Sequence, residues 1–78
     1  MWIYHSPVGI IEIKYDNRAE KLALWLNDVC GGYYLTPEAA ADDVFTQHSG
    51  IDAIDDLEEP DCYLLPHDLG EWIKVPDK

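Results

Sequence analysis

A chain of 78 residues has room for one domain, and this one carries 16 acidic and 5 basic side chains, for a net charge of −11. Such an excess of negative charge repels phosphate backbones and anionic lipid headgroups, so direct binding to nucleic acid or to a membrane surface is not expected. Apolar residues make up 47% of the chain, which predicts one folded domain over residues 1–78 rather than disorder.

The N-terminal residues lack the features of a secretion signal. They carry no basic segment, and Pro7 interrupts the position where an apolar run would continue. No apolar stretch approaches the ~20 residues that a membrane-spanning helix needs. We therefore expect a cytoplasmic protein whose two cysteines, Cys30 and Cys62, remain reduced.

The first half of the chain has the periodicity of β-strands. Residues 2–5 form a short apolar run, residues 11–15 alternate apolar with charged side chains, and residues 22–26 place leucine at every second position. Residues 33–35 follow two glycines and fit an edge strand. Together these segments predict an antiparallel meander of three or four strands.

Two polar segments between these strands predict turns. Residues 16–20 join two of them, and Asn17 is the residue there that best tolerates a positive φ. Asn27 and Asp28 predict a second, tighter turn before the glycines.

The clearest local signal is the start of a helix at Thr36. A hydroxyl at the N-cap, Pro37 at the first helical position and Glu38 in the first turn each favour a helix beginning there. Three alanines continue the helix, and Gly50 predicts its end after about three turns. The side chains expected to face the sheet are those of Ala40, Ala41, Val44, Phe45 and His48.

The last third of the chain has weaker signals. Ile51, Ile54 and Leu57 predict one or two helical turns, residues 62–65 an extended segment, and residues 68–72 a final helical turn. We expect this region to wrap the core with Trp72 as its anchor. The predicted fold class is α+β: a three- or four-stranded antiparallel meander packed by one main α-helix, with an irregular C-terminal segment.

A resemblance adds to this description. An Ala-Ala-Asp-Asp-Val helix at residues 40–44 and a Pro-x-Asp-Leu-x-Glu-Trp tail at residues 66–72 resemble a group of short uncharacterised bacterial proteins. The resemblance covers residues 32–72 and, more weakly, residues 2–9. It implies a bacterial source and a shared fold, and it carries over no catalytic or binding residue.

Metal binding and nucleophilic catalysis find little support in the spacing of the reactive side chains. The two cysteines and three histidines form no Cys-x₂₋₄-Cys or His-x₃₋₅-His pair, and the acids of residues 52–61 do not match a calcium loop. We therefore expect no metal, no cofactor and no enzyme activity. A small enzyme that pairs Cys30 or Cys62 with a histidine is an improbable alternative.

Trp25 falls on the strand face opposite the three leucines, and Trp2 is a candidate neighbour. We expect residues 51–75 to cover Trp25, because large exposed apolar patches are uncommon on monomers. The alternative is that Trp25 forms an interface with another chain. The expected oligomeric state is a monomer or a weak homodimer.

Charge is the strongest functional signal. From residue 38 to residue 72 the chain has eleven acids and neither Lys nor Arg. We predict a protein–protein interaction module that engages a basic partner; the alternatives are a nucleic-acid mimic and an acidic half that only confers solubility. The side chains predicted to form this acidic surface are Asp42, Asp43, Asp52, Asp55, Asp56, Glu58 and Glu59.

Overall fold

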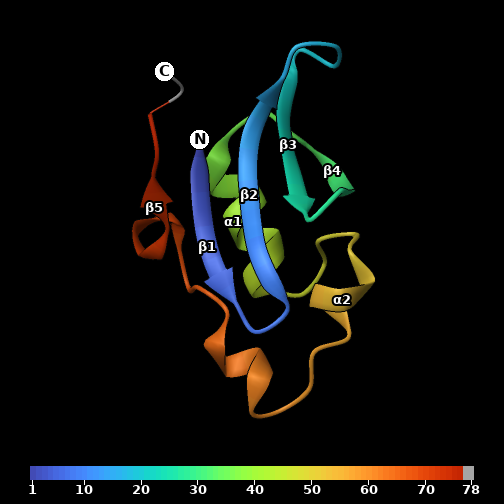
Figure 1. The fold of residues 1–78 in the computed structure, drawn as a ribbon, viewed down its shortest axis with the longest axis vertical. Coiled ribbons are helices and arrows are strands. Elements are labelled where there is room, and N and C mark those ends of the chain that lie inside the picture. The colour runs from blue at the N-terminus through green and yellow to red at the C-terminus, as the bar shows by residue number, and fades with distance from the viewer. Residues whose placement is uncertain (77–78) are drawn as a thin grey trace.

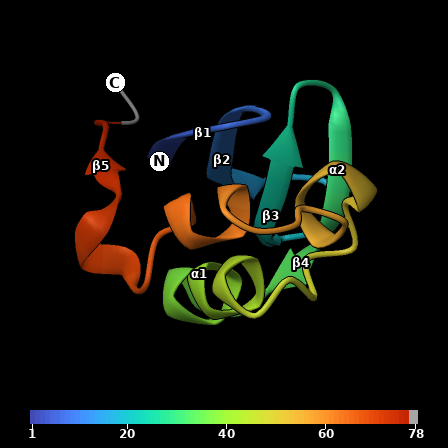
Figure 2. The ribbon, with the colours of Figure 1, turned by 90° about the horizontal axis from the view of Figure 1, so that it is seen from below.

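The computed structural model describes residues 1–76 and has a five-stranded antiparallel sheet with its helices on one face (Figures 1 and 2). The expected α+β meander with one main helix is confirmed. In chain order the elements are β1 (Trp2–Ser6), β2 (Gly9–Asp16), β3 (Lys21–Leu26), β4 (Val29–Tyr34), α1 (Pro37–Phe45), α2 (Asp52–Asp55), the 3₁₀ turns η1 (Asp61–Leu64) and η2 (Leu69–Glu71), and β5 (Ile73–Lys74).

The strands lie in the order β4-β3-β2-β1-β5. Four of them follow the sequence, as expected of a meander. The fifth comes from the C-terminus, which returns to pair with β1 through Trp2 opposite Lys74 and Ile3 opposite Ile73. This pairing places the two ends of the chain at one edge of the sheet.

The strand register separates two faces of the sheet. Ile13 lies opposite Trp2 on β1 and opposite Leu24 on β3, and this face is buried. Glu12, one residue earlier, lies opposite Ile3 and Trp25 on the other face. Because strand side chains alternate, the burial of Ile13 indicates which residues of the sheet face inward, and only the bulge between β3 and β4, beside Leu24 and Trp25, interrupts this alternation.

Helix α1 begins as predicted. Thr36 Oγ1 accepts a hydrogen bond from the Ala39 amide at 3.2 Å, with Pro37 in the first turn. Ala40, Ala41 and Val44 are buried against the sheet, as expected.

The predicted end of α1 is wrong. The helix stops at Phe45 because Gln47 takes a left-handed backbone conformation, with φ of 60°. Phe45, the last residue of the helix, and His48 beyond it are exposed and do not pack against the sheet as expected. Gly50 has a different role: a Cβ there would clash with the Gly31 carbonyl oxygen, so only glycine lets this loop approach β4 so closely.

The hairpin predicted at residues 16–20 is confirmed, but its positive φ falls on a different residue. Glu20, not Asn17, has the positive φ, at 55°. Asp16 organises this turn instead, since its carbonyl accepts from the Glu20 amide at 2.8 Å and its carboxylate accepts from the Arg18 amide at 2.9 Å. The second turn is confirmed, with Asn27 at φ 55°.

The C-terminal segment wraps the core, as expected. Leu65 and Trp72 are buried in the cluster formed by the inner face of the sheet and α1. Residues 62–65, however, are not extended. They belong largely to the 3₁₀ turn η1, where the Tyr4 hydroxyl donates to the Leu64 carbonyl at 2.6 Å.

The anchoring role of Trp72 is directly testable. Trp72→Ala should lower the free energy of unfolding by about 3–5 kcal/mol, because it removes a large buried side chain. That loss approaches the whole stability expected of so small a domain. Urea unfolding followed by circular dichroism measures it, with Ile73→Ala as the neighbouring exposed control. Equal stabilities for the two variants would contradict the anchor.

Candidate functional site

The structure divides the predicted acidic surface into carboxylates that hold the fold together and carboxylates that are free. Asp43, Asp55 and Glu59 each accept hydrogen bonds from their own chain. The other four are exposed, and no hydrogen bond or ion pair engages their side chains within residues 1–76. These four free carboxylates belong to Asp42, Asp52, Asp56 and Glu58.

Asp43 joins α1 to the edge strand β4. Its Oδ2 accepts a hydrogen bond from the Tyr34 hydroxyl at 2.9 Å, and both side chains are partly buried. Burial, followed by the hydrogen bond and the negative charge of Asp43, raises the pKa of Tyr34 well above its ordinary value of 10.0. This carboxylate is therefore part of the packing of the helix on the sheet.

Asp55 stabilises the loop between α1 and α2. Its carboxylate accepts from the Ser49 amide at 2.9 Å, from the Ser49 hydroxyl at 2.7 Å and from the Gly50 amide at 3.0 Å. Gln47 completes the connection, since its side-chain amide donates to three carbonyls of residues 54–57. The position of α2 thus depends on two polar side chains that bond to backbone.

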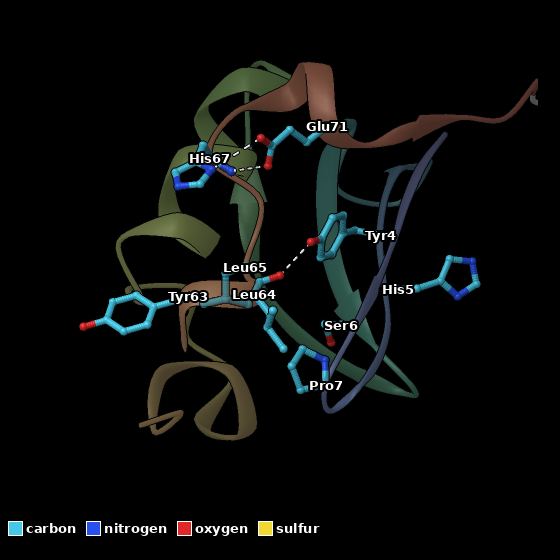
Figure 3. Close-up of a pocket in the computed structure, with 9 residues that line it drawn as sticks. All are labelled: Tyr4, His5, Ser6, Pro7, Tyr63, Leu64, Leu65, His67 and Glu71. Carbon is cyan, nitrogen blue, oxygen red and sulfur yellow. Dashed lines mark hydrogen bonds and ion pairs between the residues drawn. The ribbon is translucent and has the colours of Figure 1, made fainter. Parts of the chain in front are cut away.

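A groove that no sequence pattern predicts lies between β1 and the C-terminal segment (Figure 3). Its volume is about 480 Å³. In Figure 3, His67 and Glu71 stand together at one end of the groove and His5 points away from it. The residues that line it are Tyr4, His5, Ser6, Pro7, Tyr63, Leu64, Leu65, His67 and Glu71.

The polar end of this groove is a pair of interacting side chains. Glu71 accepts from the His67 backbone amide at 2.8 Å and lies 3.3 Å from His67 Nδ1. These two contacts lower the pKa of Glu71 below its ordinary value. The Phe45 ring lies 5.1 Å from the His67 ring, which holds the imidazole against α1. The Glu71 carboxylate and the His67 imidazole are thus engaged with each other.

The cysteines are not brought together with histidines. Cys30 Sγ lies 3.9 Å from the Gly32 carbonyl oxygen, and within residues 1–76 no hydrogen bond joins either cysteine to an imidazole. In the same part of the chain, no three His, Cys, Asp or Glu side chains are grouped as metal ligands.

The expectation that residues 51–75 cover Trp25 is wrong. That segment packs on the opposite side of the sheet, where Ile51, Ile54, Leu65 and Trp72 join the core. Figure 2 shows every helix on that side, with no segment crossing the other. Trp2 is not a neighbour of Trp25 either: the register places Trp2 on the α1 side, with Lys74 Nζ 4.3 Å above its ring.

The uncovered side, called the outer face below, combines apolar side chains with a few charges. Lys14 Nζ lies 5.5 Å from the Trp25 ring centroid and 3.7 Å from the Glu12 carboxylate. The strand register assigns to the outer face the apolar residues Ile3, Ile10, Ala23, Trp25, Cys30, Tyr33 and Ile73, together with His5, Glu12, Lys14, Asp16 and Lys21.

Substitution of two adjacent aspartates tests which carboxylates of the acidic surface stabilise the fold and which are free. Asp43→Ala should lower the free energy of unfolding by about 1–3 kcal/mol, because it leaves the Tyr34 hydroxyl without its acceptor. Asp42→Ala removes the same charge from an exposed position and should change stability by no more than about 0.5 kcal/mol. Chemical denaturation of both variants gives the comparison. An equal cost at the two positions would refute the structural role of Asp43.

The raised pKa of Tyr34 predicts a loss of stability in alkali. The unfolded chain releases the Tyr34 proton near pH 10.0, whereas the folded chain retains it. Stability is therefore full below that pH and falls as pH rises above it. Tyr34→Phe should reduce this alkaline fall, whereas Tyr15→Phe, which changes an exposed ring outside the Asp43 contact, should leave it unchanged. Urea midpoints measured across the alkaline range provide the readout.

No helix in the described residues 1–76 is long and apolar enough to cross a membrane. Comparisons of the chain with protein-family models, with curated proteins and with solved structures find no match. The resemblance to short bacterial proteins therefore stays a prediction, and any functional proposal depends on the chain's own geometry and charge.

Proposed function

We propose that this protein is a non-enzymatic interaction module of the bacterial cytoplasm that binds a basic protein through its acidic second half. One observation carries the proposal: residues 38–72 contain eleven acids and no Lys or Arg. The Lys and Arg side chains within residues 1–76 form no ion pair with the four free carboxylates. These carboxylates therefore remain available to a cationic partner.

The physical basis is long-range attraction followed by short-range pairing. A surface with one sign of charge raises the local concentration of oppositely charged partners and speeds their association. Asp52, Asp56 and Glu58 lie close together in the sequence, on a segment that Asp55 and Gln47 join to the loop after α1. A partner would thus meet several carboxylates in a defined arrangement, and the ordering cost of binding would be small.

The proposal is tested by capture of partners from bacterial lysate with the tagged protein at low and at high salt. A specific basic protein should be retained at about 0.05 M salt and lost at about 0.5 M, since screening shortens the reach of exposed charges. The double variant Asp56→Asn/Glu58→Gln should reduce the retained amount several-fold.

The matched control is Glu20→Gln/Asp28→Asn, which removes two exposed acids from the first half of the chain. It should retain the partner as the unmodified protein does. Equal losses in both variants would point to a non-specific charge effect. Absence of any specific partner at either salt would leave solubility as the role of the acids. Capture of a nucleic-acid-binding protein, with its binding groove blocked by this protein, would identify a nucleic-acid mimic.

A further inference from the structure

The outer face carries exposed apolar side chains, and no helix of residues 1–76 lies over it. Ile10, Tyr33 and Ile73 have 45%, 51% and 52% of their surface exposed, and they stand on three different strands. Trp25 and Ile3 lie between them on the remaining strands of the five-stranded sheet. An exposed patch of this kind on a small protein is typical of an interaction site.

The charges on this face differ from those of the rest of the molecule. The strand register assigns four charged residues to it, two acids and two bases, and each of them has a neighbour of opposite sign. Asp16 lies opposite Lys21 in the register, and Glu12 lies 3.7 Å from Lys14. The outer face therefore carries no net charge, although the chain carries −11.

The lack of net charge on the outer face determines which kind of partner can bind there. Two copies of a strongly acidic protein repel each other most where their acidic sides approach and least across a neutral face. A strongly basic or acidic partner would find no complementary excess of charge on this surface. A second copy does find complementarity, since Glu12 and Lys14 are neighbours with opposite charges. A two-fold axis between them brings Lys14 of each copy to Glu12 of the other.

We propose that the outer face is the interface of a weak homodimer in which two copies stack their sheets face to face. Trp25, Ile3, Ile10, Tyr33 and Ile73 would be buried in the contact, with two reciprocal Glu12–Lys14 pairs near its centre. Stacked sheets pack through the side chains of their facing surfaces in this way. The proposal is independent of the function assigned to the acidic half, because the two surfaces share no residue.

The size of the face supports a weak rather than an obligate dimer. Four strands at a spacing of about 4.8 Å, each about 17 Å long, together with the two residues of β5, present roughly 350–400 Å² per copy. The pair would bury roughly 700–800 Å² in total, which is below the ~1,000 Å² of a stable specific interface and fits only a weak, transient one. The equilibrium should therefore depend on protein concentration over the range used in solution experiments.

The test is sedimentation equilibrium of the full chain across a concentration series. The average mass should rise from the 8.9 kDa of one chain toward twice that value. Glu12→Lys or Lys14→Glu alone places like charges opposite each other and should weaken self-association by about tenfold or more, a free-energy change of about 1.4 kcal/mol. An equimolar mixture of the two variants should restore the dimer, because the like-charged faces then become complementary.

The control is Glu58→Lys, which makes the same change in charge as Glu12→Lys on the acidic half and should not weaken the dimer. Circular dichroism verifies that each variant is folded. If a charge variant fails to fold, Ile10→Ser and Tyr33→Ser replace it, since both side chains are exposed and their loss should weaken the dimer without unfolding the monomer.

Salt separates this proposal from the binding of a basic partner. Screening relieves the repulsion between two chains of like charge, so the dimer should tighten as salt rises. Binding of a basic partner should weaken over the same range. A chain that stays monomeric at every concentration and salt, or single variants that dimerise as the unmodified chain does, would overturn the proposal. Either result leaves the proposed function of the acidic half unaffected.

Discussion

The structure depends on the burial of only one face of its sheet. In β2, Ile11 and Ile13 point inward and are fully buried, whereas Glu12 and Lys14 point outward. A chain of this length supplies one long helix and one irregular segment, which is enough to cover one face. All of this cover lies on the inner face (Figure 2). The outer face is therefore left to solvent or to a partner.

This one-sided arrangement also explains how an acidic segment contributes to a core. The C-terminal half supplies Ile51, Ile54, Leu65 and Trp72 to the inner face, and its carboxylates remain at the surface. Several of these carboxylates accept structural hydrogen bonds, among them Asp43 from the Tyr34 hydroxyl and Asp55 from the Ser49–Gly50 turn. Some carboxylates of this protein therefore stabilise the fold, and others remain free at the surface.

The two proposed surfaces are compatible in one assembly. The acidic half lies with α1 and α2, on the side of the sheet away from the outer face (Figure 2). A face-to-face dimer would therefore leave the acidic surface of each copy accessible. Such a dimer would present two acidic surfaces to a basic partner, and linked binding of both would raise the apparent affinity without any new contact.

The sequence by itself determined the elements whose causes are local: the alternating strands, the Thr36 cap with its proline, and the segregation of charge into residues 38–72. It also indicated Trp72 as an anchor, because a large apolar side chain in a polar segment must find cover. Only the tertiary structure decided which acids are free, where α1 ends and which face of the sheet is covered. Those features depend on contacts between residues distant in sequence, such as Gly31 with Gly50 and Trp2 with Lys74. Spacing along the chain cannot reveal such contacts.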